Sequence, residues 1–390
     1  MTDVVIVSAV RSAVGKGKTG GALASVHAVD LSAHMMRAAI DKVGLEPGTI
    51  DDVYWGCAMP EATQGLNVAR LAWLRAELPV EVPAATVNRF CSSGLQTIAI
   101  GAQEIMSGMA DVVLAGGVEM MSQVPMSGYH TRLDPEITES YIGMGFTAER
   151  VAERWKVTRD DQDRWALGSQ QKAARALDAG AFADQIVPIS VEQVSWSGSE
   201  KESTSKEFSR DELPRPETTL EGLAKLRPAF KPGKGTVTAG NASPYSDGAA
   251  AVLLMTADRA KELGLKPLAR FITFAAAGVE PDVMGVGPIK AVPKALKRAG
   301  MQMTDIDLIE FNEAFAAQVV AVVRELGMPE EKVNVNGGAI ALGHPLGATG
   351  AKLTTQLIHE LGGRGGGVGL VTMCVGGGMG AAGLFEVYAR

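Results

Sequence analysis

The same order of expected elements occurs twice along this chain, once near each end. Each half begins with a strand, a helix and a second strand, expected at 4–8, 30–43 and 50–56 in the first half and at 268–275, 288–299 and 305–311 in the second. An internal repeat outranks local propensity as evidence of architecture. It predicts an α/β protein of two repeated halves with mixed, mostly parallel sheets packed together.

The repeat extends to the loops that follow these elements. The stretch 84–87 leads into Cys91 and a helix, and the stretch 332–335 leads through a glycine-rich loop with His344 into another helix. Each half then has an apolar strand ended by glycines, at 111–117 and 368–374. The two loops therefore occupy equivalent positions, and we expect them to face each other.

Between the repeats the pattern changes to helices at 147–155 and 158–179, followed by a polar stretch at 195–210. Insertions between repeated halves commonly shape a substrate entrance. We predict three parts, which are an N-terminal half at 1–119 completed by about 248–267, a loop domain at 120–247, and a C-terminal half at 268–390.

Charge and cysteine content exclude several classes of function. The net charge of -7 argues against a nucleic-acid binder, and no apolar run is long enough for a membrane span. The three cysteines include no close pair, so we expect a reducing compartment, and with no signal peptide at the start we expect a cytoplasmic location. The five histidines have no metal-ligand spacing, so no metal or permanently bound cofactor is expected.

Cys91 stands between an expected strand and a helix, where unpaired backbone N–H groups and the helix dipole favour a thiolate and lower the thiol pKa. That placement suits a nucleophile, although a buried structural cysteine is the commoner fate of the residue. His344, on a glycine-rich turn, can act as the base that takes the Cys91 proton. Its alternative is a capping or surface histidine.

Two further segments carry candidate catalytic groups. Cys374 ends the last apolar strand and is followed by glycines from Gly376 onward, where backbone N–H groups can approach a ligand and form an oxyanion hole. The thiol of Cys374 can serve as a second acid/base, or it can simply pack in the strand. Asn312 follows the strand at 305–311 and can hold a water or the histidine, or cap a helix.

These segments closely resemble the thiolase family from end to end. The matching stretches are 87–94, 235–243, 247–251, 312–316, 336–350 and 374–380. The resemblance implies the thiolase fold, with a loop domain that binds coenzyme A and substrate. It also implies that Cys91 is acylated, that His344 activates it and stabilises the thioester oxygen, and that Cys374 is the acid/base. Asn312 resembles the residue that positions a water at one oxyanion hole, and the N–H groups of Cys91 and Gly376 resemble the second hole.

The same resemblance suggests contacts for coenzyme A. It points to Arg215 near the adenine and phosphates, and along the pantetheine arm to Ala239, Ser243, Met144 and Phe315. Four basic residues within 225–234 agree with a local phosphate site, although alone they read as a solvated basic loop. Coenzyme A is thus expected as a substrate.

Within the family, the Cys-Ser-Ser-Gly sequence at 91–94 looks like the degradative 3-ketoacyl-CoA thiolases of β-oxidation. Gly143 stands where the biosynthetic branch typically has histidine, and Pro244-Tyr245 departs from the usual pattern along the pantetheine tunnel. A ketoacyl synthase would be expected to pair its cysteine with two histidines, whereas Cys374 and Asn312 stand here.

The hypothesis from the sequence is thiolytic cleavage of 3-ketoacyl-CoA by a ping-pong route through an acyl-cysteine. Two alternatives remain at this stage. One is condensation of two acetyl-CoA molecules by a biosynthetic acetoacetyl-CoA thiolase, and the other is a non-catalytic protein of thiolase shape that binds acyl-CoA or lipid. The resemblance implies a homodimer or homotetramer, whose number the sequence does not fix.

Overall fold

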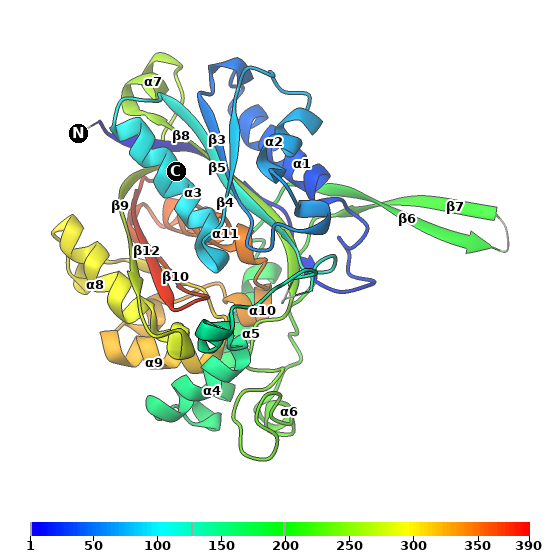
Figure 1. The fold of residues 1–390 in the computed structure, drawn as a ribbon. Helices are drawn as coiled ribbons and strands as arrows, with labels where there is room; N and C mark the ends of the chain where they lie inside the picture. Colours follow the sequence, from blue (N-terminus) through cyan, green and yellow to red (C-terminus); the bar gives the residue numbers. More distant parts are fainter. Residues whose placement is uncertain (1, 126–127, 198–199) are drawn as a thin grey trace.

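The computed structural model describes residues 2–125, 128–197 and 200–390 (Figure 1). Its strands are β1 (Val4–Arg11), β2 (Gly15–Lys16), β3 (Asp52–Gly56), β4 (Ala84–Val87), β5 (Val112–Met120), β6 (Ile189–Ser197), β7 (Glu200–Phe208), β8 (Ser246–Thr256), β9 (Ala269–Gly278), β10 (Leu308–Phe311), β11 (Gly367–Val375) and β12 (Met379–Val387). Its α-helices are α1 (Ala28–Asp41), α2 (Val68–Arg75), α3 (Ser93–Met106), α4 (Met144–Arg154), α5 (Arg159–Asp178), α6 (Leu220–Ala224), α7 (Ala257–Glu262), α8 (Pro288–Ala299), α9 (Ala316–Leu326), α10 (Ala339–Leu342) and α11 (Leu346–Gly363). Short 3₁₀ segments are η1 (Pro47–Thr49), η2 (Ala62–Gln64), η3 (Phe90–Ser92), η4 (Pro135–Tyr141), η5 (Pro281–Val286), η6 (Met303–Asp305) and η7 (Glu330–Lys332).

The strand order confirms the predicted repeat. The first half has the order β1-β8-β5-β3-β4, and the second half has the equivalent order β9-β12-β11-β10. The counterpart of β4 is reduced to an isolated parallel bridge between Ile309 and Val333. The two sheets join edge to edge where β1 pairs with β9 at Val5–Arg270 and Ile6–Ala269, so the halves share one hydrogen-bonded network.

The prediction of mostly parallel sheets is wrong. Only β3 with β4, β3 with β5 and β10 with β11 pair in parallel within the described part of this sheet. β8 and β12 run antiparallel to the neighbours on both sides. The reason is local, because each half ends in a strand that returns through the middle of its sheet, and β12 does so directly after a tight glycine turn at 376–378.

Helices cover both faces of the paired sheets and also fill the space between them (Figure 1). α3 and α11 contact each other and the strands of both halves in the centre of the molecule. α1 and α2 pack on the outer face of the first half, and α8 and α9 on the outer face of the second. In α11 only Glu360 and Gly363 are not buried, as expected for a helix enclosed on all sides. This central layer brings the loops before α3 and α11 to one edge.

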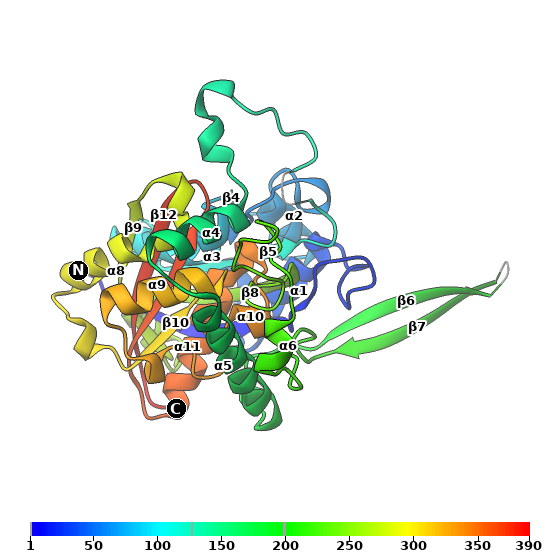
Figure 2. The same cartoon turned by 90° about the horizontal axis from the view of Figure 1, so that it is seen from below.

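The segment between β5 and β8 contains the predicted helices. α4 begins three residues before the expected position, and α5 begins after Thr158, whose side chain forms a capping box with Asp161. α5 packs against α9 and α10 of the second half. β6 and β7 form a hairpin that projects away from the rest of the molecule (Figure 2).

No helix in the described ranges is long and apolar enough to cross a membrane.

Candidate active site

Cys91 lies in η3, the turn between β4 and α3. The residue before it, Phe90, has a positive φ of 42°, a conformation uncommon for a side chain of this size. Hydrogen bonds hold this turn, since the N–H of Phe90 donates to Asn88 Oδ1 at 2.8 Å and Ser93 Oγ donates to the carbonyl of Phe90 at 2.6 Å. The strained backbone is thus fixed, and it directs Cys91 toward the second half of the protein.

The thiol of Cys91 faces the end of β11. The backbone N–H groups of Gly376 and of Cys91 itself donate to it, and Cys374 is close enough to interact with it electrostatically. Leu346 of α11 packs in the same small cluster as Cys91. The structure therefore brings the predicted Gly376, Cys374 and Cys91 together.

The expected lowering of the Cys91 pKa is wrong for this structure. Burial raises the pKa of Cys91 to about 12, and the two N–H donors only reduce this effect. No cationic side chain is among the groups that shift this pKa. The loss of water around the thiol therefore outweighs the effect of the N–H groups at the start of the helix. The resting group is a neutral thiol, which needs a base to become a nucleophile.

Cys374 is fully buried near the end of β11. Burial, followed by the neighbouring Cys91, raises its pKa well above the usual value. Its side chain belongs to an apolar cluster with Phe315, and Met144 packs against that cluster. Two of the predicted pantetheine contacts thus surround the second thiol.

His344 is positioned by the backbone on both sides of it. Gly343 has φ of 84°, and a Cβ there would lie 2.6 Å from Ser246 Oγ, so only glycine fits. The N–H of His344 donates to the same Ser246 Oγ at 3.0 Å. Buried at 5% exposure, the ring stays next to the strand β8 that carries Ser246.

Both ring nitrogens of His344 have partners. Nδ1 lies 2.6 Å from Thr349 Oγ1, and Nε2 lies 3.3 Å from the Nδ2 of Asn312, directly after β10. Burial first, and then the positive charge of Lys352, lower the pKa of His344 to about 3. The imidazole is therefore neutral at physiological pH, the form that can accept a proton.

Asn312 has one unused hydrogen-bonding atom. Asn312 is fully buried, and its Oδ1 has no hydrogen-bond partner among the described atoms. Buried polar atoms are normally satisfied by protein or water. The free oxygen beside His344 fits the predicted duty of holding a water.

Two of the three remaining coenzyme A candidates line a narrow cavity of about 50 Å³. Arg215 and Ala239 line it with apolar side chains such as Leu213 and Leu223. Ser243 does not line it, and its backbone N–H donates to the carbonyl of Ala314 at 2.9 Å. Within the basic stretch 225–234, Lys231 is already paired with Glu153 at 3.4 Å.

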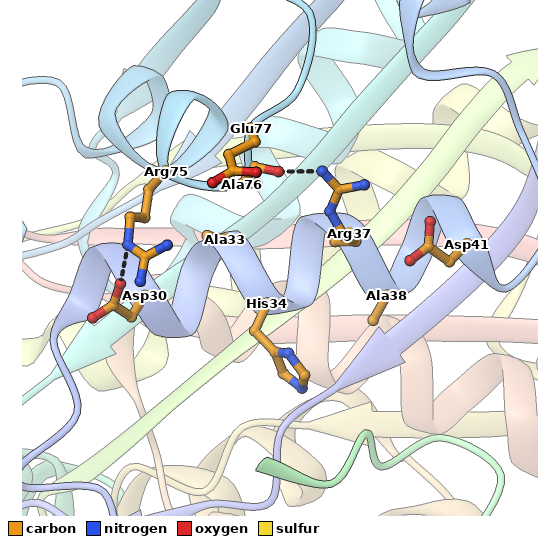
Figure 3. Close-up of a pocket in the computed structure, with 9 residues that line it drawn as sticks. All are labelled: Asp30, Ala33, His34, Arg37, Ala38, Asp41, Arg75, Ala76 and Glu77. Atoms are coloured by element: carbon orange, nitrogen blue, oxygen red, sulfur yellow. Dashed lines mark hydrogen bonds and ion pairs between the residues drawn. The ribbon is translucent and has the colours of Figure 1, made fainter. Parts of the chain in front are cut away.

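A second, larger cavity of about 770 Å³ lies between α1 and α2 (Figure 3). Its walls carry both charge signs, with the ion pair Asp30–Arg75 at one end and Arg37 donating to the carbonyl of Ala76. None of the candidate residues from the sequence lines it. We therefore assign the chemistry to the loops around Cys91.

Sequence reasoning missed the buried carboxylate of Glu119. It accepts hydrogen bonds from the N–H groups of Ala58 at 2.9 Å, Met59 at 3.2 Å and Gly347 at 2.8 Å, and from Gln64. Burial raises its pKa to about 7, although these donors oppose the rise. Glu119 thereby ties the end of β3 to the start of α11. Only its long-range partners reveal this role, so no local sequence signal could have found it.

In the part of the chain that the structure describes, no group of three or more His, Cys, Asp or Glu side chains is placed to hold a metal ion.

Comparison with known proteins agrees with this arrangement. The sequence model of the thiolase N-terminal domain matches residues 4–258, and that of the thiolase C-terminal domain matches residues 265–387. The 3-ketoacyl-CoA thiolase of Bacillus subtilis (strain 168) is 55% identical over 99% of this chain and 100% of that protein. The 3-ketoacyl-CoA thiolase of Cronobacter sakazakii is 48% identical over the same shares.

Solved structures show the same fold. The acetyl-CoA acetyltransferase of Bacillus anthracis has a TM-score of 0.88 at 42% identity, with 99% of both chains covered. The dimeric peroxisomal thiolase of Saccharomyces cerevisiae has a TM-score of 0.90 at 40% identity, with 99% of this chain and 97% of that chain covered. The predicted thiolase fold is confirmed, and the chain belongs to the thiolase family.

Proposed function

We propose that this chain cleaves 3-ketoacyl-CoA with coenzyme A, giving acetyl-CoA and a shortened acyl-CoA, as in fatty acid β-oxidation. The observation that carries the proposal is the pairing of two thiols, Cys91 and Cys374, beside the backbone N–H of Gly376, with a neutral His344 in the loop before α11, the helix that contacts the turn of Cys91. Thiolysis needs both a nucleophile and a second acid/base, and a binding protein would need neither. The names of the relatives described above support the same substrate class.

The first half-reaction begins with proton transfer. Nε2 of His344 takes the proton of Cys91, and the resulting thiolate attacks the 3-keto carbon of the substrate. The N–H groups of Cys91 and Gly376 stabilise the oxyanion at that carbon, and the protonated Nε2, with a water held by Asn312, stabilises the thioester oxygen of the enolate that forms as the C–C bond breaks. The C–C bond then breaks, the acyl group stays on Cys91, and the Cys374 thiol protonates the departing acetyl-CoA enolate.

The second half-reaction restores the enzyme. The Cys374 thiolate takes the proton of the coenzyme A thiol, and the new thiolate attacks the acyl-Cys91 thioester. The N–H groups of Cys91 and Gly376 stabilise this second oxyanion. When the intermediate collapses, the shortened acyl-CoA leaves and the Cys91 thiolate recovers the proton held by His344.

The segment 120–247 acts in this proposal as a loop domain that holds coenzyme A, between the halves 1–119 (with 248–267) and 268–390. Its cavity wall supplies Arg215 and Ala239, while Met144 and Phe315 lie beside Cys374. We place the phosphates near Arg215 and the pantetheine arm past Ala239 and Ser243. No permanently bound cofactor is required by these steps.

The direct test is a chain-length series in which loss of the 3-ketoacyl-CoA enolate absorbance is followed on adding coenzyme A. Cleavage of acetoacetyl-CoA and of longer substrates is the expected result. Turnover limited to acetoacetyl-CoA would favour the biosynthetic alternative, which the similarity to an acetyl-CoA acetyltransferase supports. Binding of substrate with no cleavage at all would contradict both and leave a binding protein.

Replacing Arg215 with alanine should raise the KM for coenzyme A about three- to tenfold with little change in kcat. The guanidinium is exposed, so its attraction to a phosphate is screened and amounts to about 1 kcal/mol. The matched control is Arg210→Ala, whose side chain is equally exposed but pairs with Asp178 outside the cavity. Equal KM values for coenzyme A in the two variants would contradict the assignment of Arg215 to the coenzyme A site.

We further propose that two copies associate along the edge strand β4, as a dimer or as half of a tetramer. β4 ends the sheet and pairs only with β3 among the described strands. Large apolar side chains beside it are exposed, including Leu66 at 88% and Val80 at 62%. The mass of a single chain, measured by sedimentation, would contradict the proposed association.

We also propose a reducing, cytoplasmic location, which the three unpaired cysteines support.

A further inference from the structure

Three threonines of α11 make the same local hydrogen bond. The hydroxyls of Thr349, Thr354 and Thr355 each donate at 2.9 Å to the carbonyl four residues earlier, and all three residues are fully buried. Such bonds are common in helices and say nothing of function by themselves. Thr349 differs because its oxygen also lies 2.6 Å from Nδ1 of His344.

The proton count at Thr349 decides how this second contact works. A hydroxyl has one proton, and the Oγ1 of Thr349 has two neighbours within hydrogen-bond distance, the carbonyl of Pro345 at 2.9 Å and Nδ1 of His344 at 2.6 Å. When the proton is donated to the carbonyl of Pro345, Oγ1 accepts from Nδ1 of His344, and Nδ1 carries the ring proton. In a neutral imidazole the lone pair then lies on Nε2.

The contact on the other side of the ring requires the same tautomer. Nε2 of His344 faces the Nδ2 of Asn312 at 3.3 Å, and an amide NH₂ group can only donate. In the resting enzyme, a proton on Nε2 would face the amide hydrogens of Asn312 and leave this contact without an acceptor. The two partners, one on α11 and one after β10, are thus both compatible with the form in which Nε2 is unprotonated.

We propose that Thr349 is a positioning residue that holds His344 as the Nδ1–H tautomer, so that Nε2 is the atom that receives the Cys91 proton. The inference rests on the proposed function only for the identity of the reaction. In the step itself, the Sγ–H bond of Cys91 breaks and an Nε2–H bond forms. The imidazolium keeps its Nδ1–H bond to Thr349 Oγ1 throughout.

Without the hydroxyl, neither neutral form of His344 is satisfied. With a valine side chain at 349, an Nδ1–H group would be buried with no acceptor, which favours moving the proton to Nε2. The ring would then present a donor instead of a base to the Cys91 thiol. A wrongly protonated base typically costs about 10²-fold or more in rate.

The test compares two nearly isosteric valine variants with a serine variant that keeps the hydroxyl. Thr349→Val removes the hydroxyl, Thr349→Ser keeps it, and Thr355→Val removes an equivalent helix bond that touches no candidate catalytic residue. We expect Thr349→Val to lose about 10² of kcat with an unchanged KM for coenzyme A. Thr349→Ser and Thr355→Val should both stay close to wild type, and equal losses in the two valine variants would overturn the proposal.

A readout that does not need turnover separates this inference from the proposed function. The rate at which iodoacetamide alkylates Cys91, read by mass, should fall in Thr349→Val but not in Thr355→Val. If the wild type cleaves no 3-ketoacyl-CoA, the proposed function fails, while alkylation still tests Thr349. If Thr349→Val does not fold, ¹⁵N NMR of the wild-type histidines decides, because a His344 protonated on Nε2 in the resting enzyme would overturn the proposal.

Discussion

Replacing Cys91 with alanine should reduce 3-ketoacyl-CoA cleavage by about 10⁴-fold or more while the fold is retained. In the proposed mechanism the variant removes the sulfur atom that forms the acyl-enzyme, so the rest of the site has no nucleophile to activate. After brief exposure of the wild type to acetyl-CoA, mass analysis should find one acetyl group on the peptide that contains Cys91. The same analysis of Cys91→Ala should find none.

Cys57 provides the matched control for this experiment. It is also a free cysteine, and its side chain is fully buried, where its thiol only approaches the carbonyl of Gln64 at 3.9 Å. Cys57→Ala should therefore keep both the adduct and most of the activity. An acetyl group that persists in Cys91→Ala, on Cys374 or elsewhere, would contradict the assignment of the nucleophile.

The resting site combines a neutral thiol with a neutral imidazole, and the sequence did not predict this. A helix terminus can be recognised in the sequence pattern, so the position of Cys91 at the start of α3 predicted a thiolate. The opposing effect, burial of the thiol under α11 and β11, depends on residues more than 250 positions away. Activation is thus expected when substrate arrives, by proton transfer to His344.

Much of the fold followed from the repeat, since apolar runs and glycines mark β1, α1 and β3 as clearly as β9, α8 and β10. Strand direction did not follow, because an apolar run looks the same in parallel and antiparallel pairing. The antiparallel strands β8 and β12 each return through the middle of a sheet. That feature comes from the chain path and not from composition.

For the site, the motifs predicted which loops meet but not what supports them. Cys91, Gly376 and Cys374 come together, as do His344 and Asn312, because the repeat places their loops at one edge. Thr349, Ser246 and Glu119 were missed as supports. Nothing in the sequence around each of these residues marks it as special. Its role appears only through a partner that the fold brings close.

Replacing Asp211 with alanine should lower the free energy of unfolding by about 3–5 kcal/mol. Its carboxylate forms a two-point ion pair with Arg11 at 2.8 and 2.9 Å, with both side chains fully buried. It also accepts from the N–H of Val14 at 2.8 Å. Removing it would leave the guanidinium of Arg11 buried without a counter-charge, and this uncompensated charge is the source of the large effect.

The ion pair matters for function because it links the inserted segment to the first half. Arg11 ends β1 and also donates to Gln185 at 2.8 Å and stacks 5.1 Å from the ring of Phe182, both just after α5. The matched control is Asp178→Ala, which breaks the exposed pair with Arg210 and should cost less than about 0.5 kcal/mol. Urea unfolding curves of the two variants should therefore separate clearly. Similar midpoints would mean that the segment 120–247 is held by its apolar contacts with α9 and α10 instead.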